Sequence, residues 1–174
     1  MPPASSSLAS AAAKPVDSGV AKPAAASAAS AAAKPAGSAN AGANGGGAAC
    51  ALVSPADVAA AYGEAFEAGS ASSPGGQSSC LFKQSGGGID TVNLLVVPAP
   101  QADNFYTTNK SGYDSTDVPG LGDRAFVSKD GGMIGVQRGG TTYLVHLVGF
   151  EKDNPASLQA KQKTFAQTVL SHAK

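Results

Sequence analysis

The chain has 174 residues and a formal net charge of zero at pH 7, with 12 Lys plus Arg against 12 Asp plus Glu. Arg124 and Arg138 are its only arginines, and neither lies in a basic run. This excludes the clustered positive charge that a nucleic-acid partner requires. No window approaches the ~18 apolar residues of a membrane-spanning helix, so no transmembrane segment is expected.

Residues 1–49 consist mainly of Ala, Ser, Pro, Lys and Gly and are expected to form a disordered tail or linker. Alanine favours helix, but Pro15, Pro23 and Pro35 divide the alanine runs into pieces too short to nucleate alone. Three lysines and one aspartate lie in this tail, which leaves nine basic and eleven acidic residues in 50–174. The composition therefore predicts a flexible spacer ahead of a single globular domain at 50–174.

A helix is predicted to begin after Ser54. This residue is a good N-cap, Pro55 suits the first helical position, and Asp57 lies where a carboxylate favours the helix dipole. Apolar residues recur at helical spacing on one face as far as Phe66. Gly63 can end the helix earlier in a left-handed cap.

The middle of the chain predicts, in order, a loop at 69–79, a strand at 80–83, a glycine turn at 85–88, a second strand at 89–97 and a short helix after Pro100. The two strands are candidates for a hairpin, and Pro98 with Pro100 ends the second one. The short helix is expected to turn Ala102, Phe105 and Tyr106 inward.

The C-terminal third predicts three strands, at 125–128, 133–137 and 142–148, separated by glycine turns at 130–132 and 138–140. A final helix is expected from Pro155 to about Ser171. The predicted order is therefore helix, two strands, helix, three strands, helix. That order is typical of an α+β fold with helices packed on an antiparallel sheet of about five strands.

Cys50 and Cys80 are the only cysteines. A disulfide between them would close a loop of about 31 residues and contribute roughly 3.5 kcal/mol in the chain-entropy treatment. Two free thiols in a cytosolic protein, and lipidation of Cys50 after the small residues 47–49, are the alternatives. Zinc needs four ligands, and two cysteines with two histidines at unpaired spacing predict no metal site. We therefore predict one disulfide and an oxidising compartment.

Residues 118–125 contain a formal G-x-G-x-x-A match that begins at Gly120 and ends at Ala125. A dinucleotide site needs these glycines after a strand and at the start of a helix, whereas here a proline precedes them and a β-prone segment follows. The pattern predicts a tight turn into a strand, in which Asp123 accepts backbone N–H bonds and Arg124 pairs with a neighbour. The alternative is a loop that contacts a ligand.

His146 lies in the most apolar predicted strand and is expected to be buried or half-buried on the face it shares with Leu144 and Val148. As a general base it needs a partner that the sequence does not place. No nucleophile elbow, phosphate-binding loop, H-E-x-x-H or calcium-loop spacing occurs, so no catalytic residue, metal or cofactor is expected. Asp123, Arg124 and His146 are the candidates for ligand contact.

Three segments carry a family resemblance: Cys50-Ala-Leu-Val-Ser-Pro-Ala-Asp-Val-Ala-Ala-Ala-Tyr-Gly63, Cys80-Leu-Phe82 and Val118-Pro-Gly-Leu-Gly-Asp-Arg-Ala-Phe126. The chain resembles small exported bacterial domains of unknown function, many of them lipoproteins of actinobacteria. In these domains a cysteine-led helix precedes a second cysteine and a G-L-G-D-x-A strand. The resemblance covers most of residues 50–170 and implies a Cys50–Cys80 bond and an envelope location, but no catalytic residues.

The absence of a reactive constellation predicts a non-enzymatic domain that binds a protein, glycan or small ligand through its sheet face or its loops. A hydrolase that uses His146 with a loop carboxylate is one alternative, and a structural or assembly module tethered by its tail is another. A periplasmic, cell-envelope or secreted location is expected from the cysteines and the tail. Residues 1–8 show neither the charged start nor the apolar run of a secretory signal.

Overall fold

The computed structural model describes residues 47–174. Residues 1–46 of the tail that was predicted to be disordered lie outside the described residues. The helices and strands are, in chain order, α1 (Ala48–Leu52), α2 (Pro55–Tyr62), β1 (Ser70–Ser72), β2 (Ser78–Lys83), β3 (Thr91–Val97), α3 (Ala102–Gly112), β4 (Ser115–Asp117), β5 (Arg124–Ser128), β6 (Met133–Arg138), β7 (Thr141–Val148) and α4 (Pro155–His172). Short 3-10 turns occupy Pro74–Gly76 and Ser85–Gly87.

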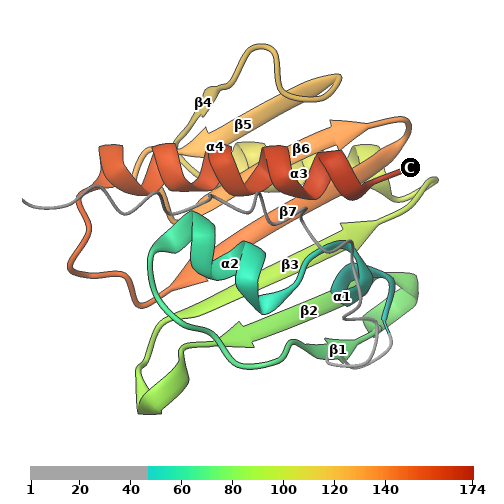
Figure 1. Ribbon diagram of the computed structural model, residues 1–174. Helices are drawn as coiled ribbons and strands as arrows, with labels where there is room; N and C mark the ends of the chain where they lie inside the picture. Colours follow the sequence, from blue (N-terminus) through green and yellow to red (C-terminus); the bar gives the residue numbers. More distant parts are fainter. Residues whose placement is uncertain (1–46) are drawn as a thin grey trace, which may run out of the picture. The chain divides into compact units, whose positions relative to one another are not determined.

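The strands form one antiparallel sheet of seven strands in the order β1-β2-β3-β7-β6-β5-β4 (Figure 1). The α+β class and the antiparallel sheet are confirmed. The expectation of about five strands was wrong, and so was the order of elements, because β1, β4 and α1 were not foreseen. Each of the two added strands has three residues and lies at an edge of the sheet. Such strands exist through their pairing with β2 and β5 and carry no alternating apolar pattern of their own.

The centre of the sheet joins two parts of the chain that are distant in sequence. The β2–β3 hairpin and the β5–β6–β7 meander form as predicted, and β3 pairs with β7 in a register that places Asn93 opposite His146. This pairing merges the hairpin and the meander into one continuous sheet.

Helices lie on both faces of the sheet. In Figure 1, α1, α2 and α4 lie in front of it and α3 lies behind the half made of β5, β6 and β7. The front layer encloses the main core, in which Tyr62 packs against Phe150 and Phe165 at ring-centroid distances of 5.3 and 5.4 Å. Behind the sheet, a smaller cluster joins α3 to three strands through Tyr106, Phe126, Met133 and Leu144.

The predicted start of α2 is confirmed in detail. Ser54 and Asp57 form a reciprocal capping box, in which the Ser54 N–H donates to the Asp57 carboxylate at 2.8 Å. Pro55 occupies the first turn, and Gly63 ends the helix with a φ of 82°. A side chain other than glycine is disfavoured at this φ, which explains why the helix stops before Phe66.

Helix α1 corrects the expected boundary between tail and domain. Ala48 and Ala49 were assigned to the tail, but both belong to this helix, and Ala49 is buried. The Ala49 N–H donates to the Ser78 hydroxyl at 2.9 Å, which ties α1 to the start of β2. The five-residue helix has no side-chain cap, so contacts with the rest of the domain hold it in place.

The predicted disulfide is confirmed: Cys50 in α1 is bonded to Cys80 in β2, with the two Cα atoms 5.0 Å apart. Both cysteines are buried. Gly69 packs directly against this bond, because a Cβ atom at Gly69 would lie 2.4 Å from the Cys80 sulfur. The disulfide therefore fixes α1 against the β1–β2 end of the sheet. None of the helices between residues 47 and 174 is long and apolar enough to cross a membrane.

Candidate functional site

The glycine-containing loop before β5 is held against the β6–β7 hairpin. Gly122 has a φ of +64°, and a Cβ atom there would lie 2.5 Å from the Gln137 carbonyl oxygen, so only glycine permits this approach. The Asp123 N–H donates to the same carbonyl at 2.7 Å. The Asp123 carboxylate accepts the Gly139 N–H at 2.8 Å, as predicted for this side chain. The G-x-G-x-x-A match is thus a turn into a strand, because β5 and not a helix follows it.

Arg124 points to a different set of partners from its neighbour Asp123. Its guanidinium carbon lies 4.2 Å from the centre of the Tyr106 ring, and its Nε donates to the Gln137 side chain at 2.6 Å. It also forms an ion pair with Asp103 in α3. The expected pairing of Arg124 with a neighbour is confirmed, and it fastens α3 to the sheet.

Tyr106, under this guanidinium, has a hydroxyl that sequence reasoning did not single out. The hydroxyl is buried and has no hydrogen-bond partner within residues 47–174. Burial raises the pKa of Tyr106, while the nearby charges of Lys110 and Arg124 act to lower it. The Lys110–Asp117 ion pair belongs to the same charged group of side chains. No pattern in the sequence marks an unpartnered hydroxyl, because the aromatic ring alone accounts for the apolar spacing of α3.

A pocket of about 470 Å³ opens beside the loop, between the β6–β7 turn and the C-terminal end of α4. Leu121 and Leu170, both buried residues, contribute apolar surface to it, and Asp123 and Arg138 contribute opposite charges. Arg138 is held in place by a hydrogen bond to the Leu170 carbonyl oxygen at 2.9 Å. Of the three candidates, Asp123 lines this pocket and Arg124 and His146 do not.

His146 is half-buried, as predicted, and lies far from the other two candidates. His146 in β7 pairs with Met133 in β6. Arg124 in β5 pairs with Gln137 in β6, which pairs with Thr142 in β7, four residues from His146. At about 3.3 Å per residue and 4.8 Å per strand, this separation is roughly 16 Å. Asp123, Arg124 and His146 therefore do not form one site.

Ser128 and Asp130 lie near His146, but the Ser128 hydroxyl is bonded to Asp130 and not to the histidine. The Ser128 hydroxyl donates to the Asp130 carboxylate and accepts the Met133 N–H at 2.9 Å, and the residue is only 2% exposed. This bond lowers the pKa of Asp130, together with the Gly132 N–H and the charge of His146. An activated serine would donate to histidine instead. Among residues 47–174, no cluster of three or more His, Cys, Asp or Glu side chains could hold a metal ion.

The sheet face behind α1 and α2 is only partly covered. Helix α3 lies against β6 and β7. Side chains on the same face of the remaining half are half-buried or exposed, and Val148 is 55% exposed. We call this surface the open sheet face; it comprises Ser70, Leu81, Lys83, Thr91, Asn93, His146 and Val148.

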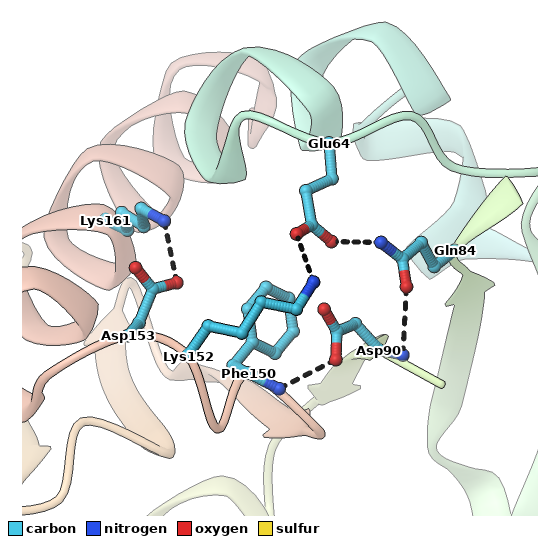
Figure 2. A network of polar contacts seen from close by, with 7 residues as sticks. All are labelled: Glu64, Gln84, Asp90, Phe150, Lys152, Asp153 and Lys161. Atoms are coloured by element: carbon cyan, nitrogen blue, oxygen red, sulfur yellow. Dashed lines mark hydrogen bonds and ion pairs between the residues drawn. The ribbon is translucent and has the colours of Figure 1, made fainter. Parts of the chain in front are cut away.

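A polar network braces the turn that follows β7 (Figure 2). Asp90 is 3% exposed and accepts the Phe150 N–H at 2.8 Å, which holds Phe150 at an unusual φ of 52°. Glu64 accepts from the Gln84 amide at 2.5 Å and pairs with Lys152 at 3.5 Å. These contacts fix the end of β7, where Val148 lies.

No protein-family model, curated protein or solved structure matches this chain. The resemblance to exported lipoprotein-like domains therefore remains a prediction from the sequence.

Proposed function

We propose that the domain is a non-enzymatic binding module of the cell envelope or extracellular space that contacts a partner protein through its open sheet face. The observation that carries this proposal is the half-covered sheet. One face packs against three helices, whereas α3 covers only the β5–β7 half of the other.

The chemistry of the open sheet face suits a protein partner. Leu81 and Val148 offer apolar surface, while Thr91 and Asn93 between them offer hydrogen-bonding groups. Lys83 is the only lysine of this face, and the face has no arginine and no acidic residue. Mixed apolar and polar surface with few charges is typical of the centre of a protein interface. Glycan sites favour exposed aromatic rings, and the open sheet face has none.

The dimensions of this face limit the kind of contact. Four strands at about 4.8 Å spacing and four residues at about 3.3 Å give a surface on the order of 200 Å². A stable interface buries about 800 Å² on each partner, so this face alone does not support a stable dimer. A single helix or loop of a partner fits the space beside α3.

The first helix of the described residues lies on the face opposite the open sheet face. The described chain enters at α1, which lies on the opposite face of the sheet together with α2 and α4 (Figure 1). The Cys50–Cys80 bond is compatible with an oxidising compartment, which supports the proposed location.

The hydrolase alternative has less support. His146 lies on the open sheet face, but the nearby Ser128 hydroxyl is committed to Asp130. The proposal therefore predicts that His146→Gln, on a folded protein, removes no hydrolytic activity.

The experiment compares Val148→Arg with Ala60→Arg, which adds the same charge to an exposed position of α2 on the opposite face. Full-length protein is cross-linked in envelope and culture fractions of the source cells, and the captured proteins are identified by mass spectrometry. We expect wild type and Ala60→Arg to capture the same partner and Val148→Arg to lose it, at unchanged unfolding temperature. Equal capture by all three proteins would refute the proposal.

A further inference from the structure

We propose that the pocket beside Asp123 binds a small zwitterion with an aliphatic side chain, such as a free α-amino acid. This site lies apart from the open sheet face and goes beyond the proposed function. It is an open depression in the surface with a volume of about 470 Å³, enough for a small molecule to lie in.

The apolar part of the pocket comes from two leucines. Leu121 reaches the core between two glycines of the loop, and Leu170 belongs to the last turns of α4. Both are buried and line the pocket. Leu121 is 6% and Leu170 is 7% exposed, so together they form a small apolar floor that an aliphatic side chain of a few carbons can contact.

The polar part of the pocket consists of two opposite charges. Asp123 and Arg138 both line it, and they form no ion pair with each other in the described part of the chain. Each side chain is held by one bond, Asp123 to the Gly139 N–H and Arg138 to the Leu170 carbonyl oxygen. The second carboxylate oxygen and the other guanidinium nitrogens have no partner among residues 47–174 and are available to a ligand.

These three features match the three groups that an α-amino acid carries on one carbon. Its ammonium group would donate to the Asp123 carboxylate, and its carboxylate would accept from the Arg138 guanidinium. Its side chain would lie on Leu121 and Leu170. A ligand with only one charge would leave the other protein group without a partner, which lowers its affinity.

The protein groups are positioned before the ligand arrives. The Asp123 N–H bond to the Gln137 carbonyl and the close approach of Gly122 fix the loop on the hairpin that carries Arg138. Little ordering of these groups is therefore needed on binding.

The test uses the full chain labelled with ¹⁵N and titrated with leucine, 4-methylpentanoate and 3-methylbutylamine. The second probe lacks the ammonium group of leucine and the third lacks its carboxylate. We expect shifts of the Gly120, Gly122 and Ser171 amide signals with a dissociation constant of about 1 mM for leucine. Each analogue should bind about tenfold more weakly. No shift of these signals at about 20 mM leucine, or equal affinity for all three compounds, would overturn the proposal.

Two variants complete the test. Asp123→Asn keeps an oxygen for the Gly139 N–H but removes the charge, and should weaken leucine binding about tenfold. Asp114→Asn removes the same charge from an exposed ion pair outside the pocket and should leave binding unchanged. Val148→Arg should also leave it unchanged, which separates this site from the open sheet face. Equal weakening by Asp114→Asn would contradict the assignment, and the analogue titrations need no variant to fold.

Discussion

Replacing both cysteines by alanine tests how much the disulfide stabilises the domain. The bond links residues 30 positions apart. The chain-entropy treatment gives about 3.5 kcal/mol for such a loop, and the loss of two buried sulfur atoms adds about 1 kcal/mol. We therefore expect Cys50→Ala/Cys80→Ala to lower the free energy of unfolding by about 4 to 5 kcal/mol, a large part of the stability of a domain of this size.

Equilibrium unfolding in urea measures this difference. With a slope of about 2 kcal/mol per molar urea, the midpoint should fall by about 2 M, and the melting temperature by roughly 12 to 20 °C. Wild-type protein unfolded under reducing conditions is the matched control, because it keeps both sulfur atoms and lacks only the bond. It should lose about 3.5 kcal/mol, with the remaining difference due to packing.

A loss below about 1 kcal/mol in both the double variant and the reduced protein would refute this reasoning. It would mean that the contacts of α1 with β2, including the bond from Ala49 to Ser78, hold the segment without help from the disulfide.

Three further predictions concern single residues. Asp90→Ala removes the acceptor of the buried Phe150 N–H and should cost about 2 to 3 kcal/mol in urea unfolding; a cost below about 0.5 kcal/mol would contradict the brace in Figure 2. Gly122→Ala should lower the free energy of unfolding by at least about 2 kcal/mol, because the new Cβ would meet a backbone carbonyl. Gly140→Ala is the control: it also has a positive φ but open space around it, and should cost only about 1 kcal/mol. Equal costs would show that the close approach at Gly122 does not matter. The pKa of Asp130 is lowered by the hydroxyl that donates to it, so its stabilising contribution is present above the unfolded pKa of about 3.9 and is lost as the pH falls through the lower folded value. Between pH 7 and about pH 2, the melting temperature should therefore fall less steeply for Asp130→Asn than for wild type. Identical slopes would contradict a stabilising role of the ionised Asp130 carboxylate.

The sequence was sufficient for the elements that carry local signals. The capping residues Ser54 and Asp57 predicted the start of α2, and its left-handed C-cap at Gly63 was foreseen as an option. The glycine turns predicted the β5–β6–β7 meander, because tight hairpins require positive φ at defined positions.

Other elements depend on contacts that are distant in sequence. Ser70–Ser72 and Ser115–Asp117 become strands by pairing with neighbours, and α1 is held by the disulfide and by Ser78. None of these segments has a periodic apolar pattern. The pairing of β3 with β7 is equally non-local.

The candidate residues illustrate the same limit. The role of Asp123 as an acceptor of a backbone N–H was predictable, because aspartate commonly does this in turns. Its place at a pocket with Arg138 was not predictable, because the pocket forms only where the loop, the hairpin and the end of α4 meet. The separation of His146 from Arg124 follows from the strand register, which the sequence alone does not set.

The oxidation state of the two cysteines in the cell is the most direct test of the account. Protein isolated from its native compartment under conditions that trap thiols should show no alkylated cysteine before reduction and two after it. This result would support an oxidising location for the domain, in which the disulfide links α1 to β2. Two alkylated cysteines in the unreduced native protein would contradict it.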